Sequence, residues 1–417
     1  MRVTHSVGNI LKAAGSSNCT SFLGCVGSRI REKSLNLHSQ LPLGCPENCS
    51  DGLETVVLQT GSPINAVSGS SLLKSGRTSS YSLLNCKRYY SSAVNKAPAK
   101  VKMSDYSKPL RYVDIGINLG DPVFRGEYHG RQVHDNDLDD VIQRARDVGC
   151  TKFMVTGSDL VESRHAIQLA QSYPGFCYAT VGVHPCQAKL FDEFPGGPDK
   201  MLEELKSLAL EAKAAGHAVA FGEIGLDYDR LFLSAKEPQL KYFEAQLDLA
   251  VDIQLPLFLH SRAASEDFEK LLAPRLEKLP KKGLVHSFTG TMDEMKRMLA
   301  LGLDIGVNGC SLKTEENLEV VKAIPLDRIQ IETDGPWCEI RPSHASAKYL
   351  EGSPALPKAV KKEKWQKGLM VKGRNEPIAI AHVAHVIARL KDITAEEVCE
   401  AAWNNSISMF GLGEEVS

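Results

Sequence analysis

Five side chains that bind metals or transfer protons each stand at or near the end of a short apolar run. Glu223 follows AVAFG, His260 follows PLFL, His286 follows GLV, Asp334 follows IQIET, and His184 follows YATVGV. Imidazole and carboxylate groups are the ligands that divalent transition metals take in proteins, and carboxylates also admit Mg²⁺ and Mn²⁺. A single buried histidine or acid is more often a structural residue. Five at matching positions predict a metal site.

The apolar runs themselves have the texture of buried parallel strands. They are apolar along most of their length, as strands covered on both faces are. Eight such runs occur, at residues 112–118, 152–157, 178–184, 218–225, 256–261, 283–287, 303–309 and 329–334. Stretches with helical spacing, several ending on glycine, lie at residues 136–149, 199–216, 237–253, 291–302 and 314–324. This alternation predicts a single α/β domain, a (β/α)8 TIM-like barrel, with a doubly wound open sheet as the alternative.

A barrel would bring these side chains together, because the carboxyl ends of its strands meet at one mouth. Asn118, at the end of the first run, would lie there too. A carboxylate from a central strand, such as Glu223, can bridge two ions that activate water and stabilise the leaving oxygen of a phosphodiester. Asp334 is expected to hold a metal or to accept a proton from the attacking water.

Composition and charge set limits on the partners of the chain. Hydrophobic residues make up 43% of the 417 residues, and the formal net charge is -2. This charge excludes a generally basic nucleic-acid binder, so a polyanion would have to be held by a local patch or by metal ions. No apolar run approaches the roughly 20 residues that span a bilayer, so no membrane association is expected.

Residues 1–105 differ in composition from residues 106–417, which form the predicted barrel domain. The first part is rich in serine, and its first acidic residue, Glu32, follows four basic ones: Arg2, Lys12, Arg29 and Arg31. This pattern favours a transit peptide for mitochondria or plastids. The alternative is a disordered leader without an address, or a natural start at Met103, which would leave the protein in the cytoplasm or nucleus.

Seven motifs along the chain resemble those of the TatD family of metal-dependent deoxyribonucleases. The resemblance is strongest to the eukaryotic TatD DNase domain-containing type 1 branch and covers residues 110 to 412. In order, the motifs are VDIGINLGDPVFRG, GVHP, AFGEIGLDYDR, PLFLHSRAA, LVHSFTG, IETDGPW and RNEP. The resemblance implies a metal-dependent hydrolase barrel that hydrolyses DNA phosphodiester bonds with a metal-activated water, as an endonuclease, a 3′-5′ exonuclease or both.

The same resemblance implies roles for the five side chains. Glu223 would bridge two divalent ions (Mg²⁺, Mn²⁺ or Zn²⁺), with His260 and His286 on one ion and Asp334 on the other. His184 in GVHP would contact the phosphate or a metal-bound water.

The first motif departs from the pattern of many family members. They carry an acidic residue followed by H-x-H, two further metal ligands, whereas this chain has Gly116 and Asn118 at the histidine positions. Glycine offers no ligand, and an asparagine offers only a carbonyl oxygen. One of the two metal sites is therefore expected to be weaker, and a strict two-metal mechanism is in doubt.

Other positions carry weaker signals for substrate binding. Arg262 and Lys313 are expected to contact phosphate, with an ion pair or a solvated loop cation as the alternatives. Trp337 and Trp365 would stack on bases or, more simply, pack in the interior. The basic run KAVKKEKWQKG at 358–368 suits a nucleic-acid backbone if it lies at the rim, and otherwise it is a solvated loop.

Two further functions remain open from the sequence. The same ligands would serve an amidohydrolase-type hydrolase of a small ester or amide, such as an aminoacyl-tRNA ester. A non-catalytic protein that still binds nucleic acid is the other. The leading prediction is a monomeric DNA hydrolase without an obligate protein partner.

Overall fold

The computed structural model describes residues 109–414. The predicted extension, residues 1–105, lies outside this range, so its boundary and its transit peptide stay predictions. The eight long strands are β1 (Tyr112–Ile117), β4 (Cys150–Val155), β5 (Cys177–Val181), β6 (Ala218–Asp227), β7 (Leu257–Arg262), β8 (Gly283–Val285), β9 (Asp304–Val307) and β10 (Ile329–Ile331). The α-helices are α1 (Leu138–Asp147), α2 (Leu160–Ser172), α3 (Leu190–Glu193), α4 (Pro198–Ala214), α5 (Lys236–Ile253), α6 (Ser265–Leu276), α7 (Met292–Ala300), α8 (Glu315–Ala323), α9 (Ile380–Lys391) and α10 (Ala395–Phe410).

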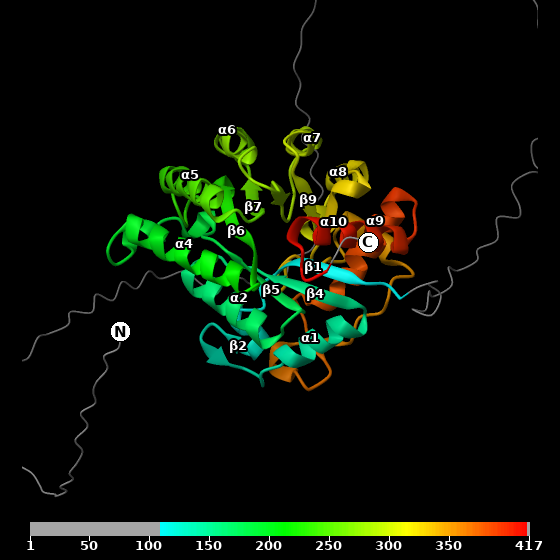
Figure 1. Cartoon of the computed structure of the whole chain (residues 1–417). Helices are drawn as coiled ribbons and strands as arrows, with labels where there is room; N and C mark the ends of the chain where they lie inside the picture. The colour runs from blue at the N-terminus through cyan, green and yellow to red at the C-terminus, as the bar shows by residue number, and fades with distance from the viewer. Residues whose placement is uncertain (1–108, 415–417) are drawn as a thin grey trace, which may run out of the picture. The chain divides into compact units, whose positions relative to one another are not determined.

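The eight strands form one parallel sheet whose spatial order follows the chain, from β1 and β4 to β10. Helices lie outside it (Figure 1). An order without reversal is that of a barrel, whereas a doubly wound sheet reverses at a switch point. The predicted TIM-like barrel is confirmed, and each predicted strand run overlaps one of the eight strands.

Bonds between the first and last strand regions close the sheet. The backbone N–H of Asp334 donates to the Gly116 carbonyl at 2.8 Å, and that of Asn118 donates to the Gly335 carbonyl at 2.9 Å. The buried Asp114 carboxylate accepts the Thr333 backbone N–H at 2.9 Å. Burial raises the pKa of Asp114 to about 8. These bonds place the polar ends of β1 and β10 side by side.

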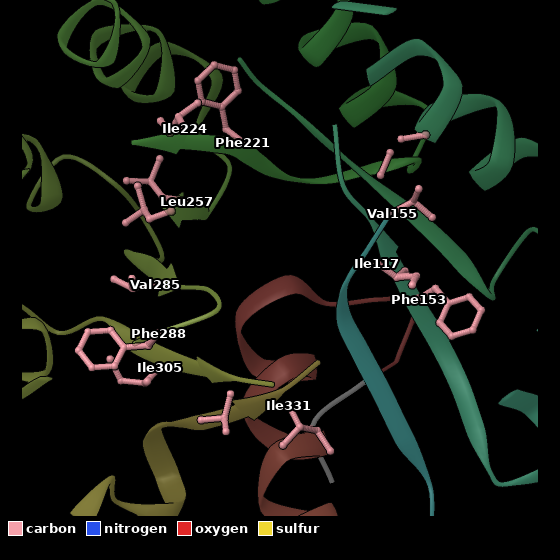
Figure 2. Close-up of a cluster of buried hydrophobic side chains, with 14 of the residues drawn as sticks. Ile117, Phe153, Val155, Phe221, Ile224, Leu257, Val285, Phe288, Ile305 and Ile331 are labelled. Carbon is pink, nitrogen blue, oxygen red and sulfur yellow. The ribbon is translucent and has the colours of Figure 1, made fainter. Parts of the chain in front are cut away.

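Apolar side chains from most of the strands fill a common core. Figure 2 shows Ile117 of β1, Phe153 of β4, Leu257 of β7 and Ile331 of β10 among them, and all four are fully or almost fully buried. The runs are apolar along their length because the parallel strands are covered on both faces. The core therefore makes a rigid frame for the residues at the strand ends.

Local signals fix where several helices begin. Thr291, Thr314 and Thr394 each cap a helix (α7, α8 and α10) through a reciprocal bond with the third helical residue. Such capping boxes satisfy backbone N–H groups that lack a partner within the helix. No helix among residues 109–414 has the length and hydropathy needed to cross a bilayer.

Candidate active site

Three imidazoles meet one carboxylate oxygen at the mouth of the barrel. Oε1 of Glu223 lies 2.6 Å from Nε2 of His286, 2.8 Å from Nδ1 of His260 and 3.3 Å from Nε2 of His184. Glu223 and His260 lie on β6 and β7, His286 follows β8 directly, and His184 lies three residues beyond β5. The structure thus brings together four of the five residues singled out from the sequence.

Two glycines allow Glu223 to come this close to His260. A Cβ atom on Gly222 would lie 2.1 Å from the Phe258 carbonyl oxygen, and one on Gly225 would lie 1.8 Å from that of His260. Both glycines have positive φ, at 155° and 151°. Only glycine fits at both positions, and its lack of a side chain allows the backbones of β6 and β7 to lie close together on either side of Glu223.

Two further carboxylates lie against the ring nitrogens of His260 and His286 that face away from Glu223. The sequence analysis did not identify them. Oδ2 of Asp227 lies 3.1 Å from Nε2 of His260, and Oε2 of Glu332 lies 3.3 Å from Nδ1 of His286. Both carboxylates are fully buried. Glu332 stands two residues before Asp334, and Asp227 four after Glu223. An acidic residue within an apolar segment is a signal of a functional role, but it does not predict which histidine ring each carboxylate contacts.

The ring partners provide a test of whether this site fits a metal ion. His260 and His286 each face a carboxylate oxygen with both nitrogens, so with ionised carboxylates and no cation each ring would need a proton on both nitrogens to donate to both oxygens. A cation on the Glu223 side would leave each ring donating its other N–H to Asp227 or Glu332. Metal-ligating histidines are typically held in this way. The residues present therefore fit a divalent cation.

Another grouping of ligand atoms includes His184. The ligand atoms of His184, Glu223 and His260 all lie within 4.8 Å of one another. The residue pattern placed His184 among the five side chains of the predicted metal site, whereas the family resemblance gave it a contact with phosphate or a metal-bound water. Its Nε2 lies 3.3 Å from Oε1 of Glu223, so His184 is a candidate metal ligand.

Charge compensation dominates the electrostatics of this cluster. Burial alone would raise the pKa of Glu223, but the charges of His286 and His184 and the hydrogen bonds of His184 and His260 hold it well below its usual value. Burial disfavours the charged form of His286, yet Glu223 and Glu332 raise its pKa well above normal. The pKa of His184 is also raised against burial, chiefly by Glu223. The cluster therefore favours the ionised form of Glu223, and the charge of Glu223 favours the protonated forms of His184 and His286.

Asp334 lies in the loop after β10 and pairs with Asn118. The Asn118 side-chain amide donates to Oδ1 of Asp334 at 3.0 Å and to the Gly335 carbonyl at 3.2 Å. The Cys338 thiol donates to the other carboxylate oxygen at 3.2 Å. Burial raises the pKa of Asp334 to about 6, against the opposing charge of His286. Asn118 therefore acts on Asp334 as a hydrogen-bond donor, in addition to any role toward substrate.

Gly116, which stands where the H-x-H pattern has its first histidine, lies directly against Glu332. A Cβ atom on Gly116 would lie only 2.2 Å from Oε2 of Glu332. The Glu332 carboxylate thus occupies the space in which a side chain at position 116 would begin. It is held there by the Ser287 backbone N–H and by the Asn308 amide at 3.3 Å.

The weaker candidates lie farther out. Nη1 of Arg262 lies 4.0 Å from Oδ2 of Asp227, and Arg262 also lines a cavity of about 710 Å³ between α6, α7 and α8. Lys313 is exposed, and within residues 109–414 no hydrogen bond or ion pair joins its side chain to the cluster. Trp337 is 59% exposed, so the expectation that it packs in the interior is wrong. Trp365 is partly buried and stacks on His134.

Comparison with known proteins agrees with this geometry. The family model described as TatD related DNase matches residues 113–411. A protein named Deoxyribonuclease Tat-D from Schizosaccharomyces pombe is 53% identical over 305 residues, covering 73% of this chain and 97% of the relative. A 3′-5′ ssDNA/RNA exonuclease TatD from Pantoea vagans is 34% identical and covers 72% of this chain and 99% of the relative.

Solved structures give the same answer for the fold. The crystal structure of a TatD family hydrolase from Entamoeba histolytica is 36% identical and superposes with a TM-score of 0.66, covering 73% of this chain and 99% of that one. With a family model that spans most of the chain and relatives covered almost completely, the protein belongs to the TatD related DNase family.

Proposed function

We propose that the protein is a deoxyribonuclease that hydrolyses phosphodiester bonds of DNA with the help of divalent cations. The observation that carries the proposal is the convergence of three imidazoles on one oxygen of Glu223. The names of its relatives, a deoxyribonuclease and a 3′-5′ exonuclease, favour DNA over a small ester or amide. Cleavage from the 3′ end, within the strand, or both is part of the proposal.

The residues divide into two groups of proposed ligands. Glu223, His260 and His286 would hold one cation, with His184 close enough to join them, and Glu223 and Asp334 would hold a second. A bound cation supplies a Lewis acid that lowers the pKa of water and neutralises charge on the phosphate. Mg²⁺, Mn²⁺ and Zn²⁺ are all compatible with imidazole and carboxylate ligands.

Asp334 is the proposed general base. Its carboxyl has a pKa of about 6, because it is buried, and it is therefore mostly ionised but still basic at neutral pH. As the water oxygen attacks phosphorus, its proton passes to Asp334 while the bond to the leaving sugar oxygen breaks. Arg262 is the group proposed to bind a phosphate oxygen, and Lys313 is proposed as a more distant contact with the backbone.

A substrate panel tests the proposal with the full chain. Single- and double-stranded oligodeoxynucleotides, single-stranded RNA and an aminoacyl ester are each incubated with Mg²⁺, Mn²⁺ or Zn²⁺. We expect DNA cleavage that EDTA abolishes and that Glu223→Gln reduces on the order of a thousandfold, because the central ligand loses its charge. DNA cleavage that survives both EDTA and Glu223→Gln, or turnover of the ester alone, would overturn the proposal.

A further inference from the structure

A strongly basic segment, residues 358–372, lies outside the site described above. We call it the lysine segment. It contains one acidic residue, Glu363, and six lysines: Lys358, Lys361, Lys362, Lys364, Lys367 and Lys372. The formal net charge of the whole chain is -2, so this excess of positive charge is local.

The lysine segment has a defined conformation. Its two ends pair as short strands, β11 (Ala359–Val360) and β12 (Met370–Val371). Between them, the Trp365 ring stacks on His134 with the ring centres 4.8 Å apart and the planes at 26°. The indole N–H donates to the Leu369 carbonyl at 2.9 Å. The lysines are therefore presented from a folded loop rather than from a tail.

A cation–π contact and a buried ion pair fix the lysine segment to the connection between β1 and α1. Lys362 lies 4.4 Å from the ring centre of Tyr128, a residue of that connection. Directly after the segment, the buried Arg374 donates to Asp137 at 2.8 Å and to Glu376 at 2.9 Å. In Figure 1 the orange part of the chain accordingly lies beside β2 (Glu127–Tyr128) and α1.

This location is at the active-site end of the barrel. The lysine segment belongs to the connection that follows β10, and Tyr128 and His134 to the connection that follows β1. Connections after strands lie at the same end as the carboxyl ends of those strands, where Asn118 and Asp334 are. Residues of both connections, His134, Trp365 and Lys367 among others, line a cavity of about 570 Å³. A strand that leaves the active site past β1 and β10 would reach this surface.

Most of the positive charge there is not neutralised. Lys358, Lys361, Lys364 and Lys372 are exposed, and no ion pair joins their side chains to a carboxylate within residues 109–414. Lys367 has only a 3.8 Å pair with Asp140. Clustered, unpaired ammonium groups repel one another and favour a polyanion, whose binding releases condensed counterions.

We infer that the lysine segment binds the phosphates of the polynucleotide at a distance from the bond that is cleaved. The inference rests on the proposed nuclease function and adds a second contact region to it. Because the segment offers ammonium groups rather than base-reading pairs, binding there is independent of sequence. It should strengthen with substrate length, since only a long strand can reach both the reaction centre and the lysines.

Removal of three unpaired lysines tests the inference. The variant Lys358→Gln/Lys361→Gln/Lys364→Gln is compared with a matched variant, Lys270→Gln/Lys278→Gln/Lys322→Gln. All six lysines are exposed, and Lys278 and Lys322 lie at the helix ends opposite the mouth. Binding of the full-length protein to labelled single strands of four and twenty nucleotides is measured by anisotropy in EDTA over a range of salt concentrations.

We expect weaker binding only for the Lys358→Gln/Lys361→Gln/Lys364→Gln variant, and only with the strand of twenty nucleotides. The affinity of this variant for the 20-mer should fall about tenfold or more, and the slope of log affinity against log salt should flatten by about 2, or roughly 0.7 per lost phosphate contact. In steady-state cleavage with a divalent cation, the ratio of KM for the 20-mer to KM for the 4-mer should rise, with kcat retained.

The other possible outcomes distinguish this inference from the nuclease proposal and from binding of an acidic protein. If the two variants bind the 20-mer equally well, the lysine segment is not a nucleic-acid surface, and the nuclease proposal is unaffected. If binding depends on the lysines but no DNA is cleaved in any metal, the lysine segment is a nucleic-acid surface and the nuclease proposal fails. If an oligoglutamate of equal charge binds as tightly, with the same dependence on the lysines, the assignment to nucleic acid is overturned in favour of an acidic protein partner.

Discussion

The two sides of the candidate active site are built from different chemical groups. The imidazole side consists of His184, Glu223, His260 and His286, and the amide side of Gly116, Asn118, Glu332 and Asp334. On the imidazole side, three rings converge on a single oxygen. On the amide side, a neutral side chain contacts Asp334. The two sides therefore differ in the number of ligand atoms that they offer a cation.

The two sides also differ in how the charge of their carboxylates is compensated. On the imidazole side the single carboxylate faces three rings, and the pKa of Glu223 is held well below its usual value despite burial. On the amide side, burial dominates and the pKa of Asp334 rises to about 6. Under the proposed function, the imidazole side would be the tighter cation site. The amide side would exchange a proton through Asp334, in keeping with the weaker site expected from the missing histidines.

Among single changes at positions other than Glu223, the largest expected effect is that of His286→Ala. The ring touches Glu223 and Glu332 at once, so its loss removes a proposed ligand and leaves two buried carboxylates without a shared donor. DNA cleavage should fall at least about a hundredfold, and cation affinity should fall with it. Steady-state kinetics and calorimetric titration with Mn²⁺ measure the two effects.

The matched control for this change is His382→Ala. His382 is a partly buried histidine that bonds the Pro354 carbonyl at 2.7 Å, on α9 and outside the cluster. Its loss should lower the free energy of unfolding while leaving cation affinity unchanged. Equal losses of cation affinity in both variants would mean that His286 has a structural role alone.

The sequence predicted the imidazole side better than the amide side, for a physical reason. Parallel strands buried on both faces are visible as apolar runs, so a histidine or glutamate at their ends stands out, as His260 and His286 do. Closure of the barrel then follows from the alternation of strands and helices. The positions of the proposed ligands could be predicted without knowledge of side-chain packing, because the fold alone brings strand ends together.

The features of the site that the sequence did not predict depend on how side chains pack in the folded protein. That the Glu332 carboxylate fills the space above Gly116 depends on a separation of 2.2 Å between residues more than 200 positions apart. The pairing of Asp227 with His260 depends likewise on the register of β6 and β7. The exposure of Trp337 reflects the path of an irregular loop, which hydrophobic periodicity does not describe.

An intermediate effect is expected for Gly116→Ala. The new methyl group would meet Oε2 of Glu332 at 2.2 Å and the ring of Phe258 at 3.2 Å. Overpacking of this kind costs about 1–3 kcal/mol of unfolding free energy, measurable by urea denaturation. Displacement of Glu332 should also weaken cation binding, because His286 loses the carboxylate that orients it.

A double-mutant cycle with Glu332→Ala identifies the cause. If the clash with Glu332 is responsible, the double variant should be more stable than the sum of the two single losses predicts. Strict additivity would place the strain elsewhere, at Phe258 or in the backbone.

The smallest effect is expected for Asn118→Ala, and it concerns pH. A cation bound by Asp334 must displace its proton, so affinity should fall as pH falls through about 6. The Asn118 amide donates to Oδ1 of Asp334 at 3.0 Å and so favours the ionised carboxylate. Removing this donor raises the pKa of Asp334. The midpoint of the pH dependence of Mn²⁺ affinity should therefore move upward, by about one pH unit or less, the worth of a single hydrogen bond.

Asn405→Ala is the matched control for this shift, because its amide also makes two bonds, to the Leu326 and Ile329 carbonyls at the other end of β10, and touches no carboxylate. That variant should lose stability without moving the midpoint. An unmoved midpoint in Asn118→Ala would mean that the amide does not favour the ionised form of Asp334, and the asparagine would then be a packing residue that merely replaces a histidine. A midpoint that moves downward would mean that Asn118 presents its oxygen to the carboxylate, reversing the assigned orientation of the amide. Only the upward shift agrees with an amide side that compensates for its missing imidazoles by tuning a single buried acid.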